Sequence, residues 1–219
     1  MMQDSLNQIP LPPGWKLEKT KEDLYLHTNE GRPFCLDFSK LKSLSSKQPL
    51  AKAIGKKASQ KVRVLDLTAG WGKDACLLAR LSYEVTAIES HPLVFAFLQS
   101  ALRKSLKKNF SLNFALDNSI NYLKSIKDEE RPEVIYMDPM FGDKKSLSVK
   151  PLRILRQLVG EPASPQELFQ AALGKALDRI VVKRHKHEKP MSLAPLKGTF
   201  SGRAICYDVY FPQNPGGVS

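Results

Sequence analysis

The chain has 219 residues, of which 42% are hydrophobic, and its 34 lysines and arginines exceed its 22 acidic residues to give a formal charge of +12. A chain of this size and composition is expected to fold around one sizeable core, and its apolar stretches are far too short to cross a membrane. The start of the chain is polar and then proline-rich, without the apolar segment of a signal peptide, so we expect a cytoplasmic protein. Its three cysteines are widely spaced, which favours reduced thiols over a disulfide framework or a metal site.

Residues 1–61 are expected to form a small extension of a main domain at 62–219. Within the extension, segments 23–28 and 33–38 alternate apolar and polar residues on either side of a turn sequence that contains Gly31. This pattern predicts a β-hairpin. The basic stretch that follows contains apolar positions that suit a short helix.

From residue 62 onward, strand and helix patterns alternate along the chain. The strands are expected at 62–67, 83–88, 110–115, 133–137 and 179–183, with a late strand at 204–211. The helices are expected at 73–81, 92–107, 119–126, 147–158 and 165–176. Such alternation implies right-handed crossovers and a mostly parallel sheet, in which the late strand would pair antiparallel with a neighbour. The predicted fold class is therefore α/β.

A loop of small residues follows the first strand of the main domain. Gly70 and Gly72 allow tight backbone geometry and the close approach of a ligand, and the amides of the next helix can receive an anionic group. The second strand ends in Glu89, 23 residues after Asp66, where an acid can bind the two hydroxyls of a ribose. Two alternatives stay open: Glu89 is a solvated strand end, and Trp71 covers the loop instead of stacking on a ligand.

The run Val-Ile-Tyr-Met at 134–137 predicts a buried strand that stops abruptly at Asp138, Pro139, Met140 and Phe141. Proline biases the residue before it toward an extended backbone, so the Asp138 carboxylate can project at the carboxyl end of the sheet, where open α/β sheets bind ligands. An acid, a proline carbonyl and a flat ring suit a planar substrate that carries an NH2 group. The simpler interpretation is a strand followed by a turn.

Basic residues are concentrated in three stretches, two of which flank these strand ends. Eight basic residues and no acid occur between Lys40 and Arg63. The other two stretches contain Lys144, Lys145, Lys150, Arg153 and Arg156, and Lys183, Arg184, Lys186 and Lys189. This distribution predicts a nucleic-acid partner whose binding depends strongly on salt. His185 and His187 flank Lys186 without acid or cysteine ligands at suitable spacing, so they favour a basic loop over a metal site.

Together, the glycine loop, Glu89 and the Asp-Pro-Met-Phe segment resemble an S-adenosylmethionine (SAM)-dependent methyltransferase. The last segment resembles the Asp-Pro-Pro-Tyr type motif of enzymes that methylate exocyclic amines. Residues 66–78, 137–160 and 180–184 are similar to the RsmJ family of bacterial 16S rRNA (guanine-N2)-methyltransferases, and the similarity extends over about residues 34–210. The resemblance implies a Rossmann-like fold of seven strands, mostly parallel, with an antiparallel carboxyl-terminal strand.

The resemblance also implies roles for matching residues. The positions that would contact SAM are Asp66, Gly70, Gly72, Lys73, Asp74, Glu89, Ser90, Asp117, Asn118, Ser119 and Asp138. The catalytic positions would be Asp138, Pro139 and Phe141, and the RNA-binding positions Lys144, Lys145, Lys150, Arg153, Lys183 and Arg184. The chain departs from the family at Lys73 and Ser90, where arginine is usual, at Asn118, where serine is usual, and at Gly142, where proline is usual. Residues 117–119 are also good helix-cap residues, and Asp66 is also suited to cap the glycine loop.

The expected function is methyl transfer from SAM to the exocyclic N2 amine of a guanosine in the 16S rRNA of the small ribosomal subunit, by a monomeric enzyme without a metal. The Asp138 carboxylate and the Pro139 carbonyl would accept hydrogen bonds from the amine, while Phe141 stacks on the base. One alternative is a DNA or other RNA methyltransferase that acts on adenine N6, and another is a noncatalytic RNA-binding or ribosome-assembly module. A nicotinamide-dependent oxidoreductase is disfavoured because Ala75 stands where its third glycine would be.

Overall fold

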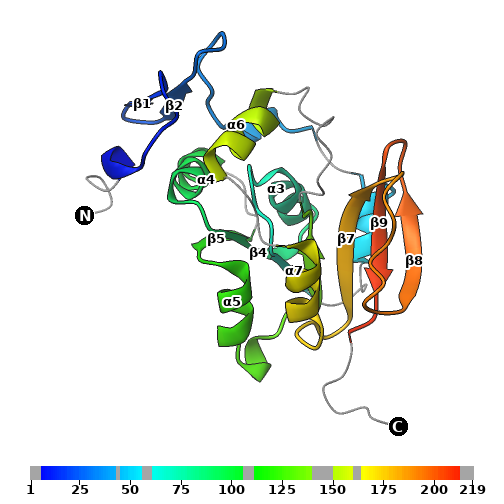
Figure 1. The fold of residues 1–219 in the computed structure, drawn as a ribbon. Coiled ribbons are helices and arrows are strands. Elements are labelled where there is room, and N and C mark those ends of the chain that lie inside the picture. The colour runs from blue at the N-terminus through cyan, green and yellow to red at the C-terminus, as the bar shows by residue number, and fades with distance from the viewer. Residues whose placement is uncertain are drawn as a thin grey trace.

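The computed structural model describes residues 6–42, 45–55, 61–105, 111–139, 150–159 and 164–212. Its centre is a seven-stranded sheet in the order β5-β4-β3-β6-β7-β9-β8 (Figure 1). The strands are β3 (Arg63–Asp66), β4 (Glu84–Glu89), β5 (Leu112–Leu116), β6 (Val134–Met137), β7 (Arg179–His185), β8 (Leu196–Ser201) and β9 (Ile205–Tyr210). Neighbours from β5 to β7 are parallel, and β9 is antiparallel to both β7 and β8. The expected α/β fold with an antiparallel carboxyl-terminal strand is confirmed.

The central strands are buried on both faces, which explains why their sequences are continuous apolar runs. All four residues of β6 are buried. Sequence patterns predicted every strand of the sheet except β8, which lies at the edge and is mostly exposed. A half-exposed edge strand that contains Gly198 has neither an apolar run nor a clean alternation, so its sequence gives little signal.

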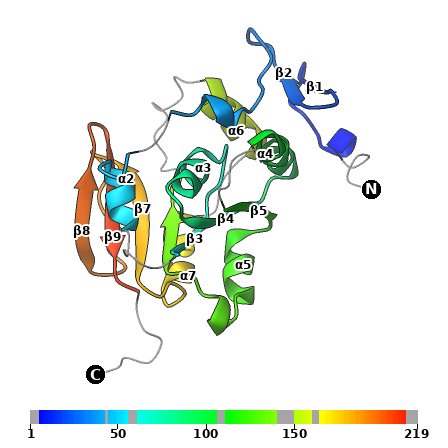
Figure 2. The ribbon, with the colours of Figure 1, turned by 180° about the vertical axis from the view of Figure 1, so that it is seen from behind.

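Helices cover the two faces of the sheet (Figures 1 and 2). On one side pack α2 (Pro49–Ile54), α3 (Lys73–Arg80), α4 (Pro92–Ser105) and α6 (Lys150–Val159), and on the other α5 (Ser119–Ser125) and α7 (Pro165–Ala172). Three short 3-10 helices complete the described helices, namely η1 (Leu6–Gln8), η2 (Phe38–Lys40) and η3 (Asp128–Glu130). Each face of the sheet therefore has its own apolar core, and the two cores are separated by the strands.

The amino-terminal hairpin exists, but its strands are not the predicted pair. Strand β1 (Lys16–Lys19) pairs with β2 (Leu24–His27), whereas the predicted partner at 33–38 contributes only an isolated bridge between Phe34 and Leu26. This pairing is determined by the turn that precedes β2. The turn is closed by two hydrogen bonds: the Asp23 amide donates to the Thr20 hydroxyl at 3.0 Å, and the Thr20 amide donates to the Asp23 carbonyl at 2.9 Å. Residues of the extension, including Leu26, belong to the same core as the helices of one face. The division of the chain at residue 61 stays a prediction.

Candidate active site

Acidic residues from several strands meet at the carboxyl end of the sheet. Asp66 is the last residue of β3 and Glu89 the last of β4, while Asp138 directly follows β6. In the sheet register Asp66 lies beside Ala87 of β4 and Tyr136 of β6. Because parallel strands end at the same edge, these carboxylates face one site, as the sequence predicts for a ligand site in an open α/β sheet.

The glycine loop begins this site and is held against the neighbouring strands. The Leu67 amide donates to the Tyr136 carbonyl at 2.9 Å, and the Ala69 amide donates to the Ile88 carbonyl at 3.0 Å. Gly72, directly before α3, has a φ of +66°, and a Cβ there would lie 2.7 Å from Leu98 Cδ2. Both the conformation and the space thus require glycine at this position, which brings the start of α3 to the site.

Trp71 is part of the core and not a stacking surface for a ligand. Its side chain is 4% exposed, and its Nε1 donates to the Pro151 carbonyl of α6 at 2.7 Å. Its ring packs against Phe34 and Phe97, with centroid separations of 4.5 Å and 5.8 Å. The indole therefore fastens the glycine loop to α6 and to the segment that follows the hairpin.

Asp66 is buried, and one of its carboxyl oxygens accepts hydrogen bonds from the glycine loop. It is 1% exposed, and its Oδ1 accepts hydrogen bonds from the Thr68 amide at 2.9 Å and the Thr68 hydroxyl at 3.3 Å. Burial raises the pKa of Asp66 to about 7 against the effect of these hydrogen bonds, with further contributions from Asp74 and Asp138. The Thr68 hydroxyl also accepts a hydrogen bond from the Asp138 amide at 2.6 Å. One threonine thus joins the end of β3 to the start of the Asp138 segment.

Lys183 of β7 connects the two remaining acids. Its Nζ lies 2.8 Å from Asp74 Oδ2 and 2.7 Å from Asp138 Oδ2. The Tyr136 hydroxyl donates to the same Asp74 oxygen at 2.6 Å. We refer to Asp66, Thr68, Asp74, Tyr136, Asp138 and Lys183 together as the acid–lysine network.

The two carboxyls that share Lys183 differ in their acidity. Burial acts to raise the pKa of Asp74, but the Lys183 charge and the hydrogen bonds from Lys183 and Tyr136 outweigh it and hold that pKa below its usual value. Burial and the Asp74 charge raise the pKa of Asp138, although Lys183 opposes them. Burial alone would lower the pKa of Lys183, and the two carboxylates raise it well above its ordinary value. Two carboxylates therefore share one ammonium group, an arrangement with room for a further positive charge.

Glu89 is placed to accept hydrogen bonds at the end of β4. It is 6% exposed, burial raises its pKa to about 7, and its Oε1 accepts from the His91 amide at 2.8 Å. Asp117 lies next to it, since the Asp117 amide donates to the Glu89 carbonyl at 3.1 Å. A buried carboxylate with remaining acceptor capacity suits the hydroxyls of a ribose.

The residues after β5 act as a helix cap. Asn118 Oδ1 accepts hydrogen bonds from the amides of Ile120 and Asn121 at 3.0 Å and 3.2 Å and so caps α5. The Ser119 hydroxyl donates to the Leu67 carbonyl at 2.6 Å, which ties the start of α5 to the glycine loop. A cap role and contact with a cofactor are compatible, because the cap lies at the same edge of the sheet.

Two of the predicted RNA-binding cations, Arg184 and Lys183, do not have the surroundings that a phosphate site requires. Arg184 is buried, and its guanidinium binds both oxygens of Asp208 at 2.5 Å and 3.1 Å. Lys183 is directed into the network described above. We therefore do not retain Arg184 as a candidate for RNA contact, and assign it to the packing of β7 on β9. Phe141, Lys144 and Lys145 lie outside the described residues.

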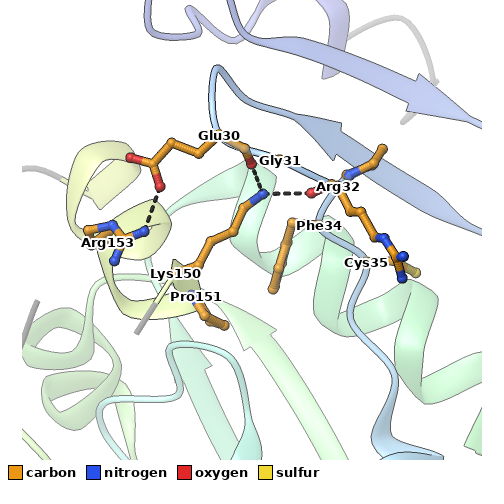
Figure 3. Close-up of a pocket in the computed structure, with 9 residues that line it drawn as sticks. Glu30, Gly31, Arg32, Phe34, Cys35, Lys150, Pro151 and Arg153 are labelled. Carbon is orange, nitrogen blue, oxygen red and sulfur yellow. Dashed lines mark hydrogen bonds and ion pairs between the residues drawn. The ribbon is translucent and has the colours of Figure 1, made fainter. Parts of the chain in front are cut away.

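Lys150 and Arg153 are joined to the extension (Figure 3). The Lys150 ammonium donates to the carbonyls of Glu30 and Arg32, and Arg153 Nη2 lies 2.5 Å from Glu30 Oε2. Around these contacts, residues 30–35 and the start of α6 line an open cavity of about 580 Å³. These two cations already hold the extension to α6, so RNA would have to compete with a carboxylate and two carbonyls for them.

Sequence reasoning did not identify Thr68, Tyr136 and Tyr207 as members of the site. Tyr136 is part of a fully buried apolar run, and only the structure shows its hydroxyl on Asp74. Tyr207 is paired in register with Lys183 across β7 and β9, and burial raises its pKa to about 12. An aromatic residue in an apolar strand gives no signal that separates a packing role from a polar one.

Comparisons with known proteins identify the family. Residues 17–212 match the family model described as "Putative SAM-dependent methyltransferase". Ribosomal RNA small subunit methyltransferase J of Legionella pneumophila (strain Corby) is 33% identical over 183 residues, which cover 81% of this chain and 74% of the relative. The chain belongs to this methyltransferase J family. Its relative in Pseudomonas aeruginosa (strain LESB58) is 38% identical over 174 residues, covering 75% of this chain and 66% of that protein.

A solved structure agrees with the family and the fold. The crystal structure of a SAM-dependent methyltransferase from Neisseria gonorrhoeae superimposes with a TM-score of 0.71 at 25% identity, covering 99% of this chain and 92% of that chain. SAM is therefore the cofactor of this methyltransferase. The acid–lysine network fits its cationic sulfonium and amino groups, and Glu89 fits its ribose hydroxyls. In the described parts of the chain no helix is long and apolar enough to span a membrane, and no group of three or more His, Cys, Asp or Glu side chains could hold a metal ion.

Proposed function

We propose that this protein transfers the methyl group of SAM to the exocyclic N2 amine of a guanosine in 16S rRNA of the small ribosomal subunit. Relatives named ribosomal RNA small subunit methyltransferase J support the RNA class of the substrate. The observation that carries the proposal is the placement of Asp138, whose amide is held by Thr68 and whose carboxylate is held by Lys183 at the end of β6. We infer that the enzyme acts in the cytoplasm, where small subunits are assembled, and that it works as a monomer.

The chemical problem is the weak nucleophilicity of the amine, because its lone pair is delocalised into the guanine ring. SAM supplies a methyl group made electrophilic by a sulfonium sulfur. Asp138 acts on the amine. Lys183 binds its Oδ2, while 41% of the Asp138 side chain is exposed and can accept an N–H of the base. The Pro139 carbonyl is the proposed acceptor for the second N–H. Two acceptors in a fixed plane localise the lone pair and orient it toward the methyl group.

Asp138 is also suited to receive the proton that the amine loses once the new N–C bond has formed. Desolvation by the surrounding protein and the neighbouring Asp74 charge raise the pKa of Asp138 although part of its side chain reaches the solvent, so its carboxylate is more basic than a fully exposed one. Phe141 is the proposed surface on which the base stacks, with Lys144 and Lys145 as proposed phosphate contacts. The target base must be unstacked to reach Asp138, at a cost of a few kcal/mol.

The test is transfer of labelled methyl from SAM to unmodified 30S subunits and to free 16S rRNA, followed by mass analysis of the nucleosides. Wild type is expected to form N2-methylguanosine. Asp138→Asn keeps the shape of the side chain but removes its charge, and should lower kcat by about 10²–10³ while SAM still binds. Asp128→Asn, in η3, is the matched control and should retain full activity.

Three results would overturn the proposal. Formation of N6-methyladenine in DNA or another RNA would move the enzyme to the adenine class. An Asp138→Asn variant that is folded and as active as Asp128→Asn would remove Asp138 from the reaction. A noncatalytic module would show no methyl transfer to either substrate and no thermal stabilisation by SAM.

A further inference from the structure

The carboxyl end of β7 carries a basic surface that is built from three segments distant in sequence. Lys186 follows β7, Arg203 lies in the turn between β8 and β9, and Lys47 precedes α2, and all three side chains are exposed. We name these three residues the basic rim. They lie at the side of the sheet formed by β7, β9 and β8, whereas the hairpin β1–β2 projects at the opposite side (Figure 1).

Backbone contacts hold the three segments together. The Lys186 amide donates to the Ala204 carbonyl at 2.9 Å, which fixes the end of β7 to the β8–β9 turn. That turn is closed by the Gly202 amide, which donates to the Ile205 carbonyl at 2.7 Å. Helix α2 packs on β8 and β9, and a Cβ at Gly202 would lie 3.8 Å from Pro49 Cγ, at the first residue of α2. The rim is therefore part of the ordered fold.

The rim cations differ from those on the hairpin side in what they bind. Among the described residues, the side chains of Lys47, Lys186 and Arg203 make no hydrogen bond or ion pair, whereas Lys150 and Arg153 bind the loop at 30–32 (Figure 3). The acid nearest in sequence, Glu188, turns inward and accepts the His185 amide at 2.7 Å. The rim thus presents uncompensated positive charge to an approaching polyanion.

A pair of imidazoles connects the rim to the catalytic carboxylate. Side chains two residues apart in a strand project from the same face, so His185 lies on the Lys183 face of β7, roughly 7 Å further toward its carboxyl end. Lys183 contacts Asp138, and His185 is close enough for its charge to lower the pKa of Asp138. The ring of His185 stacks on the ring of His187, with centroids 5.5 Å apart and an interplanar angle of 20°.

We propose that the basic rim binds the sugar-phosphate backbone of the RNA on one side of the target nucleotide, and that the His185–His187 pair stacks on an unpaired base beside it. This inference rests on the proposed function, because it assigns the surface that delivers the nucleotide to Asp138. Single-stranded RNA is bound in this way, by cations along its backbone and by flat rings against its bases. The position of the rim gives the RNA a path from β8–β9 toward Asp138.

The first test reverses the rim charges in the full chain with Lys47→Glu, Lys186→Glu and Arg203→Glu together. The expected result is at least a tenfold higher KM for 30S subunits, with little change in kcat at saturation or in SAM affinity. Loss of three phosphate contacts should reduce the slope of log affinity against log salt for unmodified 16S rRNA by about 2. The corresponding triple Gln variant, together with thermal melting of both triple variants, distinguishes the loss of phosphate contacts from the loss of the fold.

The matched control is Lys124→Glu, Lys127→Glu and Lys175→Glu, which changes the charge equally near the amino ends of the strands, where Arg131 binds the Lys175 carbonyl. If the control triple and the rim triple raise KM equally, the rim has no specific role and the inference is overturned. If wild type itself transfers no methyl to either RNA, the proposed function fails first, and this outcome is distinct from a rim that has no effect in an active enzyme.

The stacking role has its own variants at the exposed His187. His187→Ala should weaken binding of 16S rRNA by roughly fivefold or more, whereas His187→Tyr keeps a flat ring and should restore it. Equal affinity of the Ala and Tyr variants would refute stacking, while leaving the charge test of the rim intact.

Discussion

Lys183 offers a sharp test of the site, because one ammonium group lies between two carboxylates that have different roles. Lys183→Met keeps most of the length of the side chain and removes the charge. The Lys183 and Asp74 side chains are each 21% exposed, and that of Asp138 is 41% exposed, so the lost pairs are partly buried. Removing one partner of a buried ion pair costs about 3–5 kcal/mol, and the exposure of Asp138 favours the lower end of this range. A loss of about 3 kcal/mol lowers the midpoint of thermal unfolding by roughly 6–12 °C in a chain of this length.

The variant should also change the pH dependence of methyl transfer, in a direction that the structure fixes. The pKa of Asp138 is already raised, and Lys183 is the main group that opposes this shift. Without the ammonium the pKa of Asp138 rises further, so on acidification its carboxylate becomes protonated at a higher pH. We therefore expect the acid limb of the kcat/KM profile to move to higher pH in Lys183→Met. Asp74→Asn removes a charge that raises the same pKa and should move the limb the other way.

The assay is initial-rate methyl transfer to 30S subunits over a range of pH, with Lys183→Arg as the control that keeps a cation. Damage to the fold would lower activity in both Lys183→Met and Asp74→Asn without moving their acid limbs in opposite directions. An acid limb that is unchanged in a folded Lys183→Met that still binds SAM would refute the reasoning. Lys183 would then be a structural counter-ion and not a residue that positions and ionises Asp138.

Three further predictions concern the surroundings of the site. Gly72→Ala should destabilise the protein by about 1–3 kcal/mol in urea unfolding, because its Cβ would lie 2.7 Å from Leu98 Cδ2 at a φ of +66°; unchanged stability would contradict the crowding seen here. Burial raises the pKa of Glu89 from 4.5 to about 7, so the folded form keeps a proton that the unfolded chain has lost, and stability should fall as pH rises between these values. Glu89→Gln removes the titrating group and should flatten the fall in melting temperature between these pH values. An unaltered pH dependence in this variant would contradict the raised pKa of Glu89. Arg184→Met leaves Asp208 buried without its partner and should cost about 3–5 kcal/mol, with RNA affinity preserved in the folded fraction, and a selective loss of RNA binding would return Arg184 to the RNA surface.

The elements that the sequence predicted well are those whose local pattern decides their structure. Strand β6 is buried on all sides, and an apolar run followed by Asp138 and Pro139 leaves few alternatives for it. The hairpin was placed one strand too late because alternation occurs in β2 and again near Phe34, and only the turn at Thr20 to Asp23 determines the partner. Pairing is a non-local property that alternation alone does not specify.

The same limit explains the site residues. The ends of β3, β4 and β6 were predictable, because acids after apolar strands converge at one edge in a parallel sheet. Lys183 and Arg184 were interpreted as surface cations, since adjacent basic residues after three apolar ones give no period that tells which side chain points inward. In the structure Lys183 pairs with Asp138 and Arg184 pairs with Asp208, and both acids come from distant elements. Partner choice of this kind depends on the assembled sheet.

The charges of the protein are divided in a way that suits both ligands. Inside, Asp74 and Asp138 share the single positive charge of Lys183, which favours the cationic groups of SAM. Outside, the basic rim faces a polyanion that these acids would repel, by roughly 0.4 kcal/mol for each pair of charges 10 Å apart in water. Bound SAM reduces that repulsion, so cofactor and RNA should favour each other's binding, with a coupling that is equal in both directions. Because this coupling is equal in both directions it sets no order of binding, but it makes RNA bind more tightly to a site that holds SAM, where a methyl group is present to react with the base at Asp138.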